Sequence, residues 1–157
     1  MIRALILYTA VTSGLSAGIF YAFSSFVMKA LGDLPPAQGV AAMNSINRQA
    51  PTPLFMIVLM GTSLTGTFLG GYGLLNLGKP GSALLVAGAA AYLTAILLTG
   101  VYHVPRNDRL MSLDPGTAAA AAYWKTYLSQ WTAWNHLRVA GPLAAAVAFT
   151  LAWRQSG

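Results

Sequence analysis

The charged residues of this chain are separated by long stretches that contain none. No Asp, Glu, Lys or Arg occurs in residues 4–28, 49–78, 80–105 or 139–153. A helix needs about 20 apolar residues to cross the hydrocarbon core of a bilayer, and the first three stretches provide that length outright. The fourth stretch is shorter. This spacing predicts a membrane protein whose backbone crosses the bilayer four times.

The composition argues against an ordinary soluble domain. Of the 157 residues, 56% are hydrophobic and 8% are charged, whereas soluble domains usually carry about 25% charged residues. So few charges could not cover the surface of a soluble fold of this size, so lipid must surround part of the chain. The length allows a single transmembrane domain, residues 1–157.

We expect the four spans over residues 5–29, 53–77, 82–102 and 129–153, in an all-α, up-down-up-down four-helix bundle. The fourth helix must begin near Ser129, because residues 139–153 alone are too short to cross, and it therefore carries Arg138 inward. An open sheet would leave backbone groups unpaired in hydrocarbon, and no series of alternating strands indicates a barrel. The N-terminal apolar stretch is too long for the apolar region of a signal peptide, so we expect a retained helix.

The connections between the spans are unequal. Residues 78–81, Gly-Lys-Pro-Gly, form a tight turn between the second and third spans, while the two long connections lie together on the opposite side. Pro35 and Pro36 precede a predicted short helix through residues 38–49. Residues 114–116, Asp-Pro-Gly, predict a capped start for an alanine-rich helix in the second long connection. We therefore expect short extra helices in both long connections.

The net charge of +6 invites a nucleic-acid interpretation, but the basic residues are scattered singly and form no dense patch, so we expect no nucleic-acid partner. The positive-inside rule instead favours an inner-membrane protein with cytoplasmic long connections. Five basic residues lie on that side and three on the other, namely Lys29, Arg48, Arg106, Arg109 and Lys125 against Arg3, Lys79 and Arg154. The chain has no cysteine, which excludes disulfides and thiolate ligands.

Five residues of the fourth helix, spaced three or four apart, predict a stripe on one helix face: Trp124, Tyr127, Trp131, Asn135 and Arg138. The aromatic residues alone would suit an interfacial belt, and Arg138 could extend to the headgroups. Ionisable residues inside a membrane are costly, however, and usually face a cavity or a partner. We therefore expect Arg138 to face a substrate.

His136 lies off this stripe but beside its polar end. Asn135 and Arg138 could bind an oxyanion, and an imidazole can accept a proton near neutral pH, so the three residues are candidates for catalysis. Alternatively, His103 and His136 could ligate haem or a metal. No carboxylate lies within a span and no third strong ligand is evident, so we expect no metal or haem cofactor and keep that site as the alternative.

At these residues the sequence resembles the anthrone oxygenase family, a set of small four-helix membrane proteins. The resemblance spans nearly the whole chain and rests on four segments: GIFYAFS at residues 18–24, AMNSIN at 42–47, VPRNDRL at 104–110 and WTAWNHLR at 131–138. Characterised members act in polyketide pathways. They are monooxygenases that convert an anthrone into an anthraquinone, without a classical flavin or haem.

The resemblance implies one pocket lined by Asn47, Asn107, Trp131, Asn135, His136 and Arg138. We add Trp124, Tyr127 and His103 as substrate-binding candidates, although His103 departs from the family pattern, which often has asparagine there. An anthrone is flat and apolar, so it could enter the bundle sideways from the bilayer. His136 would take its proton, Arg138 with Asn135 or Asn107 would stabilise the enolate oxygen, and the carbanion could react with dioxygen directly.

Two other functions stay open at this point. The chain could be a non-catalytic membrane subunit whose polar face holds a lipid headgroup or a partner protein. It could also be a haem or quinone protein. Four helices are few enough that a homo-oligomer is compatible with any of the three.

Overall fold

The computed structural model describes residues 1–156, and within this range it consists of helices and short connections without a strand. Four helices are long and apolar enough to cross a membrane by length and composition: Ile2–Gly32, Pro53–Leu75, Ser82–Met111 and Ala118–Gln155. The predicted all-α membrane protein with four long apolar helices is therefore confirmed.

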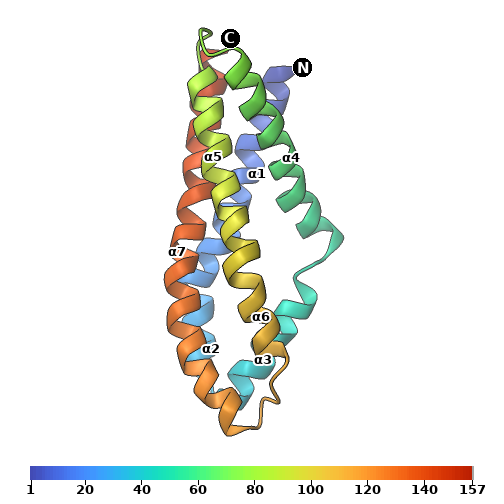
Figure 1. Ribbon diagram of the computed structural model, residues 1–157, viewed down its shortest axis with the longest axis vertical. Coiled ribbons are helices and arrows are strands. Elements are labelled where there is room, and N and C mark those ends of the chain that lie inside the picture. Colours follow the sequence, from blue (N-terminus) through green and yellow to red (C-terminus); the bar gives the residue numbers. More distant parts are fainter. Residues whose placement is uncertain (157) are drawn as a thin grey trace.

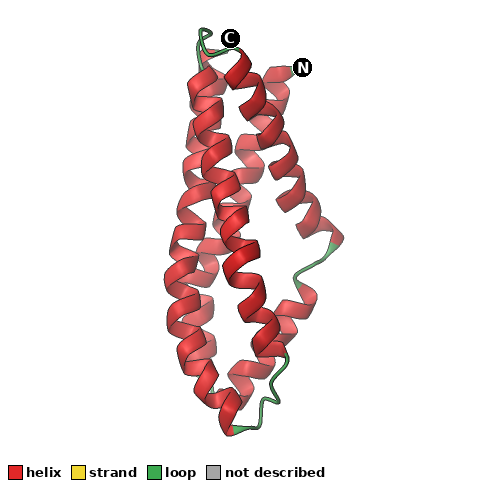
Figure 2. Ribbon diagram, viewed as in Figure 1, coloured by secondary structure: helices red, strands yellow, loops and turns green. Residues whose placement is uncertain are grey.

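The helices lie roughly side by side in an elongated bundle (Figures 1 and 2). Both ends of the chain and the turn between α4 and α5 lie at one end, here called the termini end; α3, α6 and the start of α7 lie at the other, the loop end (Figure 1). In chain order the elements are α1 (Ile2–Ala22), the π-helix η1 (Phe23–Val27), α2 (Met28–Gly32), α3 (Pro36–Gln49), α4 (Pro53–Leu75), α5 (Ser82–Leu98), the π-helix η2 (Thr99–His103), α6 (Val104–Met111) and α7 (Ala118–Gln155).

Side chains at the helix starts explain where α4 and α7 begin. Thr52 accepts a hydrogen bond from the backbone N–H of Phe55 at 3.2 Å, and Thr117 accepts one from Ala120 at 3.2 Å. Each threonine satisfies an N–H group that has no partner within its own helix. The turn between α4 and α5 needs Gly81, whose φ of +82° places it in the left-handed region.

The helix α7 begins at Ala118, well before the expected start at Ser129. Alanine has the highest helix propensity of any residue type. The alanine run after Thr117 therefore continues the helix from its cap without a break. The third crossing likewise continues beyond the expected end at Tyr102, through η2 and α6 to Met111. As a result, the second connection contains residues 112–117 only.

The helix α7 packs against both α1 and α5, while α4 packs mainly against α5. Close approach of α4 to α5 depends on small residues, because a Cβ at Gly70 would lie 2.7 Å from the Cβ of Ala89. The buried residues form one cluster toward the termini end, which includes Ile6, Tyr92 and Phe149, and a second toward the loop end, which includes Met43 and Trp131. The polar residues of α7 lie beside the second cluster.

Candidate functional site

One face of α7 carries the candidate site. Trp124, Tyr127, Trp131, Asn135 and Arg138 are all buried, as their spacing in the sequence predicts. From this face they meet α1 and η1 on one side and η2 and α6 on the other. The site therefore lies inside the bundle, between the middle of the molecule and its loop end.

The guanidinium of Arg138 is the central charge of the site. Its side chain is 7% exposed, its Nε donates a hydrogen bond to Oδ1 of Asn135 at 3.0 Å, and its Cζ lies 4.2 Å from the ring centre of Phe20 and 5.0 Å from that of Trp131. No Asp or Glu side chain of residues 1–156 forms a salt bridge with it, and its two terminal nitrogens form no hydrogen bond with described residues. Since an isolated charge is costly to bury, a guanidinium arranged in this way is suited to an anionic ligand.

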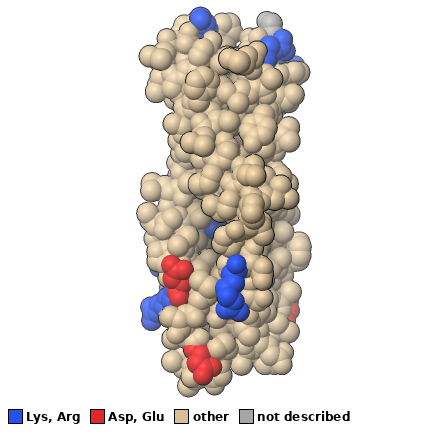
Figure 3. Space-filling model, turned by 90° about the vertical axis from the view of Figure 1, so that its right-hand side faces the viewer, with Lys and Arg blue, Asp and Glu red and all other residues tan. Residues whose placement is uncertain are grey.

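The molecular surface is hollowed on the side where α4 begins (Figure 3). Figure 3 shows Lys or Arg atoms recessed in a hollow at about mid-height, on the side of the molecule where α4 begins. Among residues 1–156, Arg138 is the one basic residue that is buried. The α4 residues nearest its start are open to the surroundings, since Leu54 is 75% exposed and Ile57 63%. An apolar molecule could therefore approach from the bilayer on this side.

Asn135 holds Arg138 in place and links α7 to the first crossing. Its Nδ2 donates hydrogen bonds to the carbonyl of Phe20 and to Oγ of Ser24, both at 2.8 Å, and its Oδ1 accepts the bond from Arg138. All of these bonds fix the direction of the amide. The oxygen of Asn135 is consequently committed to the guanidinium, and the terminal nitrogens of Arg138 remain available.

His103 is fully buried beside the same indole ring. It stands edge-on to Trp131 with 4.9 Å between ring centres, and its Nδ1 lies 3.4 Å from the carbonyl of Leu98. Its Nε2 is enclosed and has no hydrogen-bond partner among the described residues. The guanidinium of Arg138 also lies against Trp131, so the same indole contacts both the imidazole and the charge.

Asn107 brings α6 into the site. Its Oδ1 accepts hydrogen bonds from the hydroxyl of Tyr127 at 2.7 Å and from Nε1 of Trp131 at 3.0 Å. Both donors belong to the α7 stripe, so Asn107 fixes the tilt of the ring that faces His103 and Arg138. Asn107 therefore orients Tyr127 and Trp131, and its Oδ1 is already occupied by these two donors.

Asn47 and Trp124 lie closer to the loop end. Nδ2 of Asn47 and Nε1 of Trp124 are enclosed without hydrogen-bond partners in the described residues. Trp124 packs tightly on α3, because a Cβ at Gly39 would lie 2.9 Å from its Nε1. Trp124 joins the rest of the site through Tyr127, on which it stacks with 5.6 Å between ring centres, and neither Asn47 nor Trp124 forms a hydrogen bond with Arg138.

The structure does not bring His136 into this region. His136 is exposed, as are its neighbours Trp134 (41%) and Leu137 (58%). Successive residues of an α-helix point about 100° apart, so a residue next to Asn135 and two before Arg138 faces outward when those two face inward. His103 and His136 therefore do not share a buried site, and no group of three potential metal ligands occurs among residues 1–156.

Both π-helices lie at the site. The segment η1 contains Ser24, which accepts the bond from Asn135, and η2 ends at His103. At η2 the N–H of Val104 bonds to the carbonyl of Thr99, five residues back, and this wider turn accommodates Pro105 in a continuous helix. Single π turns inside α-helices are frequent at functional sites. Their coincidence with Asn135 and His103 supports this location.

Sequence reasoning missed Phe20 and Ser24 as parts of the site, although both lie in the GIFYAFS segment. It also missed Pro142, whose missing N–H leaves the backbone carbonyl of Arg138 without its helical partner. The sequence does contain a signal for it, because a proline four residues after Arg138 indicates an interrupted helix.

Comparison with known proteins identifies the family of this chain. The family model for anthrone oxygenase matches residues 42–148, which is more than half of the chain and includes the second half of α3, η2, α6 and the polar part of α7. No curated protein and no solved structure matches the chain. The match to the family model shows that the chain belongs to the anthrone oxygenase family.

Proposed function

We propose that this protein is a membrane-embedded monooxygenase that oxidises a flat, apolar, anthrone-like substrate with dioxygen. Family membership supports an oxygenase-like function. The observation that carries the finer proposal is Arg138, a buried cation with no carboxylate partner among the described residues and with two rings against it. Such a charge needs an anion, and an aromatic enolate supplies both the anion and the flat face.

Arg138 would act on the oxygen of the substrate. Deprotonation of an anthrone moves negative charge onto its carbonyl oxygen, and positioned donors in a water-poor site stabilise such a charge strongly. The terminal nitrogens of Arg138 are free to donate, while Asn135 holds the guanidinium from the other side. The rings of Phe20 and Trp131 would lie next to the aromatic substrate.

We propose His103 as the proton acceptor. The sequence alone favoured His136, but that residue is exposed on the outer face of α7. His103 offers an enclosed Nε2 without a partner, beside the indole that Arg138 also contacts. A neutral imidazole in such a position can accept a proton from an activated carbon within reach. This role would be particular to chains that carry histidine at this position.

The reaction balances with dioxygen as the sole oxidant. The base removes one proton from the CH₂ group of the anthrone, and the carbanion transfers electrons to O₂ and forms a C–O bond with it, which gives a peroxide anion. The returning proton completes the hydroperoxide. Loss of water then leaves a C=O group, so that one oxygen atom enters the quinone and the other leaves as water.

The test is conversion of an anthrone by the purified protein in detergent under ¹⁸O₂. We expect oxygen uptake above the non-enzymatic rate and a quinone that carries one ¹⁸O atom. The control is the same micelle with the protein heat-denatured, because anthrones oxidise slowly without a catalyst. Absence of any rate above this control would overturn the proposal and favour a binding or assembly subunit.

A further inference from the structure

A cavity lies at the termini end, remote from Arg138. Its volume is about 380 Å³, and it is enclosed by the start of α1, the turn between α4 and α5 and the end of α7. Arg3 and Lys79 line it, together with polar groups that include Ser82 and Gln155. Two cations therefore face one small cavity at the level where the helices end.

Among residues 1–156, no Asp or Glu side chain forms a salt bridge with either cation. The guanidinium Cζ of Arg3 lies 5.1 Å from the ring centre of Trp153, and Nζ of Lys79 lies 6.0 Å from that of Tyr72. The chain has only three acidic side chains, Asp33, Asp108 and Asp114. Figure 3 shows Asp or Glu only toward the loop end, whereas Lys or Arg occurs at both ends. This cavity thus presents positive charge to an external anion.

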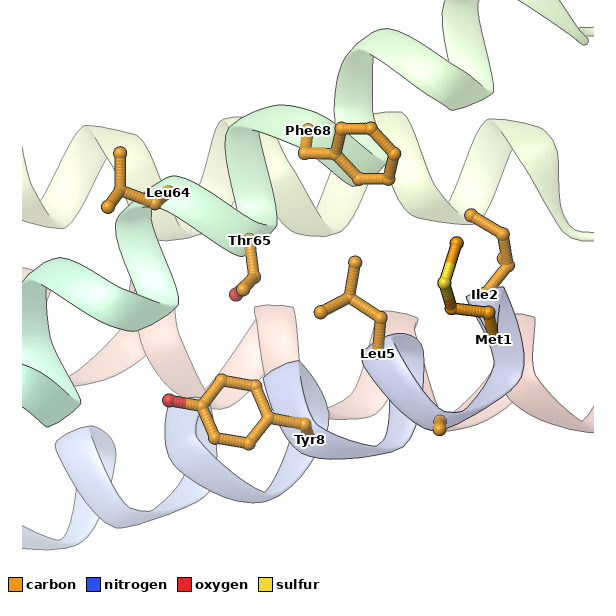
Figure 4. Close-up of a pocket in the computed structure, with 8 residues that line it drawn as sticks. Met1, Ile2, Leu5, Tyr8, Leu64, Thr65 and Phe68 are labelled. Atoms are coloured by element: carbon orange, nitrogen blue, oxygen red, sulfur yellow. The ribbon is translucent and has the colours of Figure 1, made fainter.

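An apolar groove of about 630 Å³ adjoins the cavity between α1 and α4. Leu5 and Tyr8 of α1 face Leu64 and Phe68 of α4 across it (Figure 4). Ile2 lines both the groove and the cavity, so the two lie next to each other at this residue. The groove leads from the charged end along the membrane-crossing parts of both helices.

We propose that the cavity and the groove together bind one anionic phospholipid, with its phosphate between Arg3 and Lys79 and one acyl chain between α1 and α4. The depth is suitable, because Tyr and Trp lie beside the cations as they do at the headgroup level of membranes. Basic residues at that level attract anionic lipids. A free phosphate would leave the groove empty, and a zwitterionic lipid would carry no net charge to complement the two cations.

The test compares phosphatidylglycerol with phosphatidylcholine of the same acyl chains, added to the full chain in detergent. Native mass spectrometry measures bound lipid, and thermal unfolding measures stabilisation. We expect about tenfold more bound phosphatidylglycerol, and a higher melting temperature with it. In the double variant Arg3→Gln, Lys79→Gln both effects should vanish. The control, Arg48→Gln with Lys125→Gln, removes the same charge from exposed positions at the loop end and should keep both.

A further variant tests the groove separately. Ala4 lines the groove and is exposed, so Ala4→Phe should fill part of it without disturbing the core. We expect weaker retention of phosphatidylglycerol and an unchanged melting temperature without lipid. Equal binding of both lipids, equal loss in the control variant, or equal stabilisation by inorganic phosphate alone would each overturn the proposal.

Discussion

Arg138 and Asn135 are three positions apart in α7, so that one helical turn places the amide against the guanidinium. This pair, and the burial of both residues, could be predicted from sequence spacing. Their partners in the first crossing could not. Asn135 bonds to Phe20 and Ser24 across separations of 115 and 111 residues, and no local pattern indicates contacts at that range.

The cost of burying Arg138 leads to a prediction about stability and turnover together. Arg138→Met removes an unpaired buried charge and keeps much of the side-chain volume. Replacing a buried charge by an apolar residue is often neutral or stabilising. We therefore expect a melting temperature equal to or above that of the wild type, and a loss of kcat/KM on the order of 100-fold, as for removal of one oxyanion donor.

Thermal unfolding and initial rates of oxygen uptake measure the two quantities on one preparation. A melting temperature well below the wild type would show that Arg138 chiefly supports the fold. Unchanged kcat/KM would show that the substrate oxygen lies elsewhere.

The two histidines give a second prediction about individual residues. We expect His103→Gln to lower kcat on the order of 100-fold or more, because a positioned general base contributes about that much. His136→Gln serves as the matched control, and its exposed side chain should be replaceable with little change in rate. Steady-state oxygen uptake with an anthrone measures both. The reverse ranking would return the role of base to His136.

At the scale of elements, the periodicity of the sequence predicts helices but not π turns. A π turn adds one residue to an otherwise regular helix, and the apolar pattern of a membrane span is too uniform to show the shift. Both π turns carry residues of the candidate site, since η2 ends at His103 and η1 contains Ser24.

Removal of one residue from η2 tests this role. Deletion of Gly100 should convert the π turn into a regular helix, because it removes the one residue that the wider turn adds. We expect the helical circular dichroism to remain and turnover to fall, because His103 is the last residue of the turn that is rebuilt and its ring would no longer stand in the same position against Trp131. Gly100→Ala keeps the register, and its Cβ would meet no atom within 4 Å, so it should retain activity. An active deletion variant would contradict the role of the π turn.

For the whole molecule, the charge-free stretches predicted the number of crossing helices, and the structure bears this out. The start of α7 was harder to predict, because the alanine run after Thr117 is equally compatible with a separate helix in the second connection and with the beginning of the fourth span. The capping by Thr117 resolves this in favour of one continuous helix. The side of the membrane occupied by each end rests on the charge bias alone.

Single cysteines can test the arrangement and the orientation, since the chain has no cysteine of its own. Gly78→Cys places a thiol in the turn at the termini end, and Gly116→Cys places one in the connection at the loop end; both positions are exposed. In intact cells we expect a membrane-impermeant maleimide to label the first and not the second. Labelling of both without permeabilisation would contradict the crossing pattern, and the reverse result would invert the orientation.

The central claim is that Arg138 holds the oxyanion of a deprotonated aromatic substrate. The most direct measurement is the visible absorption spectrum of an anthrone bound to the purified protein without oxygen, because the enolate absorbs at longer wavelength than the neutral ketone. The account predicts an enolate band with the wild type, and its loss with Arg138→Gln at a substrate concentration that saturates binding. An enolate band of equal strength in both proteins, or none with the wild type, would contradict it.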